Sequence, residues 1–549
     1  MRLHLQIRPS IARTAAVGAL AFLFTSGMPL SAFGQAAQPL QTQQAAAART
    51  PGLAQDQQPS TSSVANGTAL SMEEAVRMAL ENNLGIQAEK LNPEIQNYVV
   101  ARANAVWAPS LVSAFTRSNS TAPPTSFLSQ TASVVTDGTS FGQAGLQQAL
   151  RWGGGNYTFT FDGSRGTTND PGSPFPQSLQ SHMSGIFNQP LLRNFKIDNN
   201  RANLMQQHNL QTVADLQLQQ RVTQTSLAVR TAYYNLVGAI SGLDVANESL
   251  DLAKRALKDN QTRVEVGTMA PIDITAAEAE VASNEEGVIL QQAAIQSAQD
   301  QLRTLVMNSS QPGFWATTFK PTDQPTLQPY DINLDAAVKN ALEHRTDIQQ
   351  LKKQMQNTDV SAKLAQNQRL PGIDLQARYG VTGIGGTRNI YDTSGLTQDI
   401  IGTSVKGFGD VLRDVFGNDF RTWSVALNFS YPLGTSQADA ALAQARLTQK
   451  QEGTQLTDLE TAVTAQVREG ARQVDTNLKR VEATRKASEL AQKRLEAENK
   501  RFTVGLSSTF ELFQAQRDLS RAKQSELSAL IDYNRAIVAY EAVQVAPVR

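Results

Sequence analysis

Two short helix-breaking segments divide this 549-residue chain into two similar parts. Residues 501–506 (Arg-Phe-Thr-Val-Gly-Leu) have a counterpart in residues 263–268 (Arg-Val-Glu-Val-Gly-Thr), 238 positions earlier. Each segment stands between two long helical patterns, and glycine takes up the left-handed conformation that ends a helix more readily than other residues do. We therefore predict that Gly267 and Gly505 are the turns of two helical hairpins, and that the chain contains an internal duplication.

An apolar seam with a seven-residue period leads into each turn. In the first part the seam consists of Val222, Val229, Leu236, Leu243, Leu250, Leu257 and Val264. Small residues follow three positions later at Thr225, Ala232, Ala239, Ala246 and Ala253. In the second part the same frame holds Val467, Val474, Val481, Leu495 and Phe502, with Ser488 as its one polar member. This pattern predicts long coiled-coil helices whose small positions allow close packing.

The two parts also begin alike. Ser71 and Glu74 have the spacing of a capping box that opens a helix, and a similar helix opening returns at residues 332–338. With no gaps, an offset of 262 residues pairs Leu80 with Leu342 and Pro109 with Pro371. Agreement over some forty residues favours duplication.

After each of these prolines the pattern changes to a period of two. Alternation of apolar with polar or small residues is seen at 111–116, 157–161, 182–189, 373–379 and 423–431, with Gly-, Ser-, Thr- and Pro-rich loops expected at 118–140 and 383–409. Runs of about nine or ten residues suit tilted transmembrane strands. An antiparallel sheet of a soluble sandwich alternates in the same way, so the pattern alone leaves both interpretations open.

Helix lengths constrain the architecture. The predicted helix at 196–262 has roughly 66 residues and would be about 100 Å long. The helices expected at 72–107 and 271–307 are each about half as long, so we expect them to be stacked end to end along the long one. The second part repeats this arrangement with 436–501, 334–369 and 508–545. The strands are then expected about 100 Å, or somewhat less, from the glycine turns.

Composition argues against several functional classes. The chain has 49 basic and 49 acidic residues, so nothing favours nucleic acid as a partner. It has no cysteine and only four scattered histidines, which argues against thiolate sites, metal centres and a histidine base. With no nucleophile–base pair or metal set to support catalysis, we expect no enzyme and no cofactor.

We predict the following organisation from residue patterns. Residues 1–34 are a signal peptide, because basic residues precede a short apolar run and a small-residue cleavage site. Residues 35–68 are a disordered Gln/Ala/Pro-rich arm. Residues 69–310 form repeat 1 with helix, strands, long helix and return helix; residues 311–330 form a Pro-rich connector; residues 331–549 form repeat 2 with the same plan.

The order and spacing of several short motifs resemble the TolC-like outer-membrane efflux protein family, from residue 70 to about residue 545. These motifs are Ala108-Pro109-Ser110-Leu111, Leu370-Pro371-Gly372-Ile373, Gln189-Pro190-Leu191-Leu192, Tyr431-Pro432-Leu433, Thr231-Ala232-Tyr233-Tyr234-Asn235 and the two glycine turns. The resemblance implies a homotrimer in the cell outer membrane, in which each copy gives four strands to a shared twelve-stranded transmembrane β-barrel. The additional alternation at 157–161 leaves open a larger barrel or an extracellular hairpin.

The fold class expected is therefore a mixed α and β membrane protein with two internal repeats. A long antiparallel α-helical coiled-coil barrel would form a periplasmic tunnel, and a transmembrane β-barrel would be shared by the trimer. The resemblance implies three kinds of partner besides the other copies: a periplasmic adaptor (membrane fusion) protein, an inner-membrane pump and outer-membrane lipid. Edge strands that cannot close a barrel alone agree with pairing between copies.

The resemblance also assigns roles at the turns. Val266, Gly267 and Thr268, together with Val504, Gly505 and Leu506, match the tips that dock onto the adaptor. Asp273 and Glu511 match acidic positions that ring the entrance constriction. Carboxylates from three copies would favour cations there. Alternatively, the two acidic residues merely stabilise the first turns of their helices through the macrodipole.

The chain departs from the family pattern at three positions near the turn. Phe502 stands where a Tyr latches the closed tip, Ser507 stands where an Arg does, and Gln514 replaces a further acidic residue. A salt bridge from Ser507 to Asp273 is impossible, so a closed state must be held otherwise or less tightly.

Two functional hypotheses follow. The first is a passive exit duct of a tripartite efflux pump or type I secretion system, which conducts small molecules or proteins to the exterior. The second is an exported periplasmic coiled-coil scaffold without channel activity, which explains the heptads but gives no reason for strand faces suited to lipid.

Overall fold

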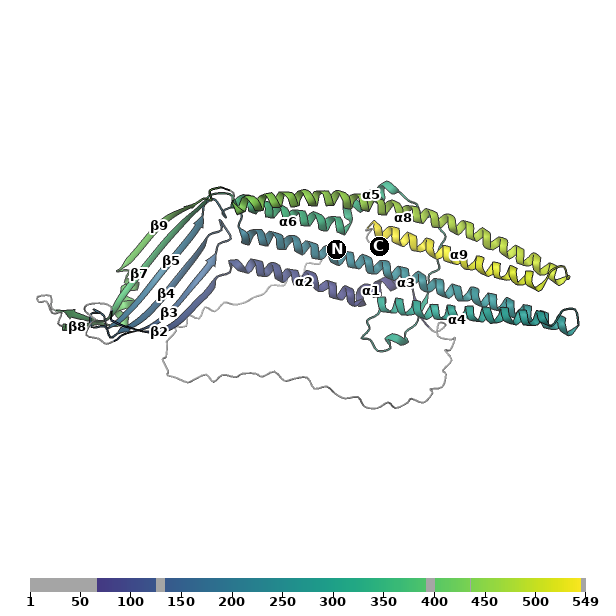
Figure 1. Ribbon diagram of the computed structural model, residues 1–549, viewed down its shortest axis with the longest axis horizontal. Helices are drawn as coiled ribbons and strands as arrows, with labels where there is room; N and C mark the ends of the chain where they lie inside the picture. Colours follow the sequence, from purple (N-terminus) through teal and green to yellow (C-terminus); the bar gives the residue numbers. More distant parts are fainter. Residues whose placement is uncertain (1–66, 125–133, 392–399, 435, 545–549) are drawn as a thin grey trace, which may run out of the picture. The chain divides into compact units, whose positions relative to one another are not determined.

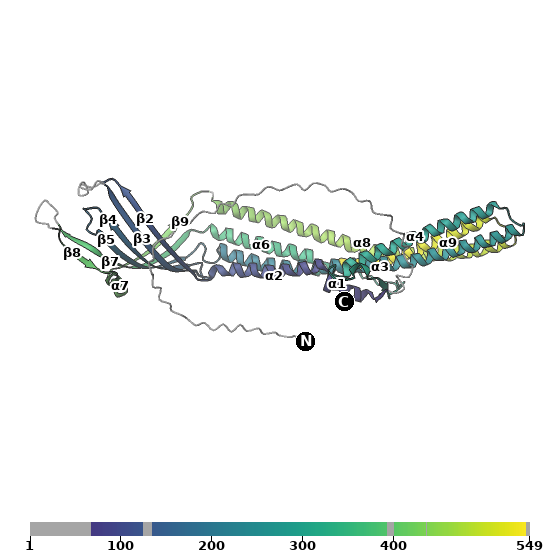
Figure 2. The same cartoon turned by 90° about the horizontal axis from the view of Figure 1, so that it is seen from below.

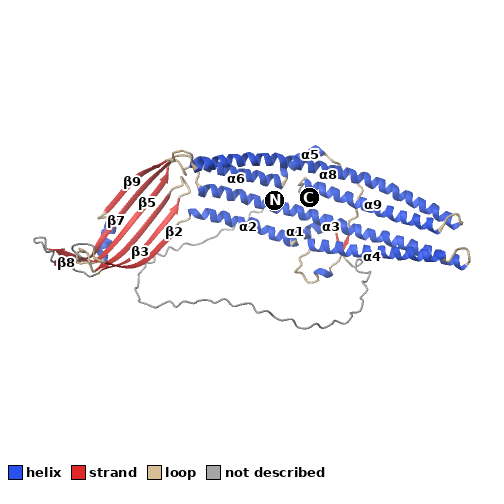
Figure 3. Cartoon of the chain, viewed as in Figure 1, coloured by secondary structure: helices blue, strands red, loops and turns tan. Residues whose placement is uncertain are grey.

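The structure is a computed structural model that describes residues 67–124, 134–391, 400–434 and 436–544. All of these residues belong to the second of two units, residues 61–549. The predicted signal peptide and all but the last two residues of the predicted arm lie outside the described residues. Among the helices described, none is both long and apolar enough to cross a membrane. Figure 3 shows the division of the chain into helices and strands.

Two helices of 67 residues each, α3 (Asn199–Glu265) and α8 (Gln437–Thr503), are the longest elements described. Each reverses at a glycine into a helix of 35 residues, α4 (Ile272–Val306) and α9 (Thr509–Val543). The pairs α3/α4 and α8/α9 lie side by side (Figure 1). Seam residues are buried along α8, including Ser488. The predicted pair of helical hairpins is confirmed.

The opening helices differ from the sequence prediction, because each is broken near its first third. The structure has α1 (Met72–Asn82) and α2 (Leu84–Asn104) in place of one helix, and α5 (Leu334–His344) and α6 (Thr346–Gln368) in place of the other. The breaks fall at Asn83 and Arg345, whose ψ angles of 119° and 130° are extended. The Asn83 side chain accepts hydrogen bonds from the first N–H groups of α2, so it caps a new helix.

The short helices cover the long ones in succession. Helices α1, α2 and α4 contact α3, while α5, α6 and α9 contact α8. Helices α3 and α8 are linked to each other through α6 and α9. The expected arrangement of half-length helices along each long helix is therefore present in the described chain.

One antiparallel sheet lies at one end of the helices (Figure 1). Its strands are β2 (Ser110–Ala122), β3 (Val135–Ala149), β4 (Asn156–Thr168), β5 (Gln177–Pro190), β7 (Gly372–Tyr391), β8 (Ile400–Lys406) and β9 (Arg421–Ser430). Within the described residues the order is β2-β3-β4-β5-β7, and β8 and β9 both pair with the far edge of β7. Figure 1 and the turned view in Figure 2 show these strands side by side.

The predicted loops at 118–140 and 383–409 are partly wrong. Strand β2 extends to Ala122 and β3 begins at Val135, while β7 extends to Tyr391 and is followed by β8 and helix α7 (Phe408–Gly417). The small residues that suggested loops have a packing role instead. A Cβ on Gly383 or Gly385 would lie 2.3 Å or 2.5 Å from atoms of Val411, so glycine lets α7 lie against the sheet.

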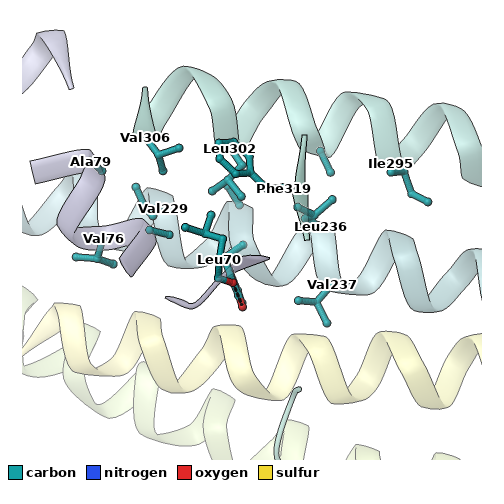
Figure 4. Packing of buried hydrophobic residues seen from close by; sticks show 14 of the residues in the cluster. Leu70, Val76, Ala79, Val229, Leu236, Val237, Ile295, Leu302, Val306 and Phe319 are labelled. Carbon is teal, nitrogen blue, oxygen red and sulfur yellow. Dashed lines mark hydrogen bonds between the residues drawn. The ribbon is translucent and has the colours of Figure 1, made fainter. Parts of the chain in front are cut away.

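The chain segment expected to be an extended connector is partly structured. Residues 311–330 contain a 3₁₀ turn, η3 (Phe314–Ala316), and a short strand, β6 (Phe319–Pro321). Strand β6 pairs in parallel with β1 (Thr68–Leu70). Leu70 and Phe319 lie in an apolar cluster with side chains of α1, α3 and α4 (Figure 4). This cluster fixes the middle of the long helix α3.

A buried tyrosine secures this region. The Tyr233 hydroxyl donates to the carbonyl of Leu70 at 3.0 Å and accepts from the N–H groups of Thr322 at 3.2 Å and Asp323 at 3.1 Å. Its burial raises the pKa of Tyr233. One side chain of α3 therefore satisfies three backbone groups from two distant segments.

We expect Tyr233→Phe to lower the free energy of unfolding by about 1–3 kcal/mol, because buried backbone groups lose their partner. Tyr234→Phe is the matched control, since that neighbouring hydroxyl makes only a 3.4 Å contact with Asn534. The unfolding midpoint of the purified protein, followed by circular dichroism, measures the difference. Equal midpoints for the two variants would contradict this role.

Candidate functional site

The two glycine turns have the same backbone geometry. Gly267 and Gly505 both have φ of +74°. In the first turn the Gly267 N–H donates to the Val264 carbonyl at 3.0 Å, and the Thr268 N–H donates to the Arg263 carbonyl at 2.9 Å. In the second turn the Gly505 N–H donates to the Phe502 carbonyl at 3.2 Å, and the Leu506 N–H donates to the Arg501 carbonyl at 2.9 Å. This is the Schellman pattern, in which a left-handed residue ends the helix and satisfies its last carbonyl groups.

Apolar side chains are exposed at both turns. Val266 and Val504 are each 68% exposed, and Leu506 is 70% exposed. Ile272 and Phe510, in the first turns of the return helices, are exposed to a similar extent. We call residues 263–273 and 501–511 the helical tip. Its exposed apolar residues are a feature of interaction surfaces, although scattered apolar residues also occur on ordinary surfaces.

Contacts between the hairpins hold the tip together. The Arg263 guanidinium lies 4.7 Å from the centre of the Phe502 ring and donates to the Phe502 carbonyl at 3.5 Å. Farther from the turns, Arg517 of α9 donates to Glu280 of α4 at 2.8 Å, and the Glu280 side chain is mostly buried. Phe513 of α9 packs among Ala256, Ala277 and Leu257.

The two predicted acidic residues have different surroundings. Glu511 is exposed and completes a capping box with Ser508, and it also accepts from the Ser507 hydroxyl at 2.8 Å. These bonds from Ser507 and Ser508 lower the pKa of Glu511, so its carboxylate keeps its charge to a lower pH. Asp273 is half-buried, and its backbone carbonyl accepts a hydrogen bond from the Asn260 side chain at 3.4 Å. Within the described chain no hydrogen bond or ion pair joins Asp273 to Glu511.

Ser507 and Gln514 take part in contacts within their own hairpin. The Ser507 hydroxyl bridges the Glu498 and Glu511 carboxylates. Gln514 donates to Asp518 at 3.0 Å and accepts from Arg517 at 3.2 Å. Near the tip, Arg517 and Arg263 therefore make polar contacts between the hairpins, beside the apolar packing of Phe513. Sequence reasoning missed both residues, although Arg263 and Arg501 occupy equivalent positions in the two turn segments.

The sheet has two chemically different faces. Paired residues on neighbouring antiparallel strands share a face. One face carries Leu111, Phe115, Leu146, Phe159, Tyr379, Trp423, Val425, Leu427 and Phe429, all between 38% and 79% exposed. The opposite face carries hydrogen-bonded polar side chains, including Asn156, Asn188 and Gln376. In the described residues no group of acidic, histidine or cysteine side chains could hold a metal ion.

Comparison with known proteins identifies the family. The sequence profile of the outer membrane efflux protein family matches residues 157–306 and 337–543. These residues include both glycine turns and most of the sheet. The chain therefore belongs to the outer membrane efflux protein family, whose members are transport proteins and not enzymes.

Individual proteins are similar to this chain in sequence or in fold. The chain is 24% identical over 310 residues to outer membrane protein TolC of Escherichia coli (strain K12), an alignment that spans 56% of this chain and 58% of that protein. The fold is similar to the outer membrane channel CmeC of Campylobacter jejuni, with a TM-score of 0.61, 13% identity, and coverage of 86% of this chain and 85% of that chain. It is also similar to the outer membrane protein VceC of Vibrio cholerae, with a TM-score of 0.60, 14% identity, and coverage of 86% and 95%.

The positive φ at the turns gives a direct test of the tip geometry. We expect Gly505→Ala to destabilise the second turn by about 1–2 kcal/mol, because a side chain is strained in the left-handed region. Open space surrounds Gly505, so the cost comes from the backbone and not from a clash. Hydrogen exchange at the amides of residues 505 and 506 should become about tenfold faster in the variant.

Gly453→Ala is the control, because Gly453 lies within α8, is likewise free of close neighbours and has no positive φ. Alanine should stabilise that helix by about 0.5–1 kcal/mol. Similar effects of the two substitutions would contradict the left-handed turn.

Proposed function

We propose that this protein is the passive outer-membrane exit duct of a tripartite efflux pump or type I secretion system. Three copies join their sheets into one transmembrane β-barrel, and their helices form a tunnel through the periplasm. Small molecules or proteins enter from an inner-membrane pump through a periplasmic adaptor. The energy for transport comes from the pump, because the duct itself performs no chemistry.

The exposed apolar face of the sheet is the observation that supports this proposal most strongly. On β9, Trp423 and Phe429 are 73% and 69% exposed. Burying one such side chain is worth about 1.5–3 kcal/mol, so leaving a whole row of them in water is unfavourable. Lipid contact on this face, with water on the polar face, accounts for both surfaces.

The sheet edges support assembly from several copies. Within the described chain, β2 pairs only with β3 and β9 pairs only with β7, so each has one unpaired edge. Unpaired N–H and C=O groups are costly in a bilayer, so these edges need partners. Pairing of β2 in one copy with β9 in the next copy satisfies both edges and closes a ring.

The helical tip is proposed as the docking site for the adaptor. Its candidate residues are Val266, Gly267, Thr268, Val504, Gly505 and Leu506. The valine and leucine side chains are exposed at the ends of the hairpins, where a partner can cover them. Asp273 and Glu511, which follow the turns, are proposed as the residues of the entrance constriction.

Membrane extraction separates the duct from an exported scaffold. We expect the protein to stay in the outer-membrane fraction after washing with high salt and alkali, because the apolar sheet face is immersed in lipid. Detergent should then release a particle with the mass of a trimer, measured by light scattering. Release by salt or alkali would favour the periplasmic scaffold.

Charge removal tests the constriction. We expect Asp273→Asn combined with Glu511→Gln to reduce cation selectivity in planar bilayers and to weaken any block by divalent cations. Ser508→Ala is the control, since it removes half of the same capping box without changing a charge. Unchanged selectivity in the double variant would mean that the two acidic residues only stabilise the first turns of their helices.

A further inference from the structure

We propose that the exit barrel of this protein has eighteen strands, six from each of three copies. The six are β2, β3, β4, β5, β7 and β9, and the β3–β4 hairpin is a segment of the barrel wall. The resemblance in sequence implies four strands for each copy, so this chain would have a wider exit. The inference rests on the proposed trimeric duct and specifies its bore.

Backbone pairing places the hairpin within the sheet. Strand β3 pairs with β2 from Ser110↔Gln147 to Ala122↔Val135, which is the full length of β2. Strand β4 pairs with β5 from Asn156↔Asn188 to Thr167↔Gln177. A hairpin that extended outside a four-stranded sheet would instead leave β2 and β5 as direct neighbours. Here β3 and β4 separate them along the whole shared length.

The side chains of the hairpin continue both faces of the sheet. Leu146 and Phe159 pair across β3 and β4 and belong to the exposed apolar face. On the polar face the hydroxyl groups of Thr160 and Ser184 are 2.8 Å apart. A hairpin in the extracellular medium has no need for an apolar row in register with that of its neighbours. A barrel-wall strand does, because one of its faces meets lipid.

The hairpin turn is built into the junction between sheet and helices. Arg151 donates to Asn104 at 2.6 Å and lies 5.1 Å from the Trp107 ring centre, at the end of α2. The Trp152 ring packs edge-on against Phe195, just before α3, at 5.6 Å. The turn is therefore attached to the two helices on which the tunnel depends.

Two glycines make this attachment possible. Gly153 and Gly154 have φ of +66° and +67°. A Cβ on Gly154 would lie 2.5 Å from the carbonyl oxygen of Asn194, so a larger residue does not fit. Gln189 of β5 donates to the Gly153 carbonyl at 2.8 Å, which connects the turn to the next strand of the wall.

The ring of helices has room for the larger barrel. Helices α2, α3, α6 and α8 lie in succession beside the sheet, so a trimer would place twelve helices around the tunnel. At interaxial distances of about 8–10 Å their ring measures roughly 100–120 Å. Eighteen strands spaced by about 4.8 Å and tilted by about 40° give roughly 110 Å, whereas twelve give roughly 75 Å. At this tilt an eighteen-stranded barrel therefore has a circumference within the range of the helical ring.

Paired cysteines test the strand order in the full-length protein, which has no native cysteine. Ser113→Cys with Ala144→Cys tests the contact between β2 and β3, and Thr160→Cys with Ser184→Cys tests that between β4 and β5. Ser113→Cys with Met183→Cys is the control, because these residues share a row of the sheet but lie three strand spacings apart. Mass spectrometry of oxidised, detergent-purified protein detects the disulfides.

We expect disulfides within one chain for the first two pairs and none for the control. Formation of the control disulfide in place of the others would place β2 beside β5 and overturn the proposal. Electron cryomicroscopy of the unmodified trimer provides the strand count, with eighteen expected. A closed trimeric barrel of twelve strands would overturn this inference while leaving the duct intact. A particle with no closed barrel would overturn the proposed function together with it.

Discussion

The structure depends on the need to satisfy backbone hydrogen bonds at the edges of a sheet whose one face is apolar. Within the described chain, β2 and β9 leave one edge each unpaired beside the helix ends, and the exposed apolar face extends to both of them. Water could satisfy the edges but not the face, and lipid could satisfy the face but not the edges. Closure with other copies in a membrane satisfies both, which is why assembly is central to the proposed duct.

The helices must also bury apolar surface, and they do so by packing against one another. A helix of 67 residues is about 100 Å long, and its apolar seam must be covered over that length. Three shorter helices cover each long one, and the buried Tyr233 and Phe319 lie in the apolar cluster at the middle of α3. Because each long helix starts at the sheet and ends at a glycine turn, chain continuity places the turns a full helix length from the strands.

Residue patterns predicted elements whose cause is local. The heptads predicted α3 and α8, and the left-handed preference of glycine predicted both turns, because each depends on residues close in sequence. The break at Asn83 was missed, since its side chain also donates to the carbonyl of Leu305, 222 residues away. Strand β3 was missed for a similar reason. It is rich in glycine and glutamine and has weak alternation of its own, but it pairs on both sides with better-patterned strands.

In the candidate site, too, local features could be predicted from the sequence and contacts between distant segments could not. Its turn residues could be predicted, whereas the contact of Arg263 with Phe502 and the pair of Arg517 with Glu280 join segments about 240 residues apart. The departure from the expected family pattern at Phe502 and Ser507 was visible in the sequence. The side chains that link the hairpins were not, because no spacing rule relates residues on different hairpins.

The ion conductance of the purified full-length protein in planar lipid bilayers decides whether its copies form a channel. We expect discrete conductance steps from trimeric particles, because a closed barrel continued by a helical tunnel is a water-filled path. Monomeric protein that binds to the bilayer without conducting would contradict this expectation.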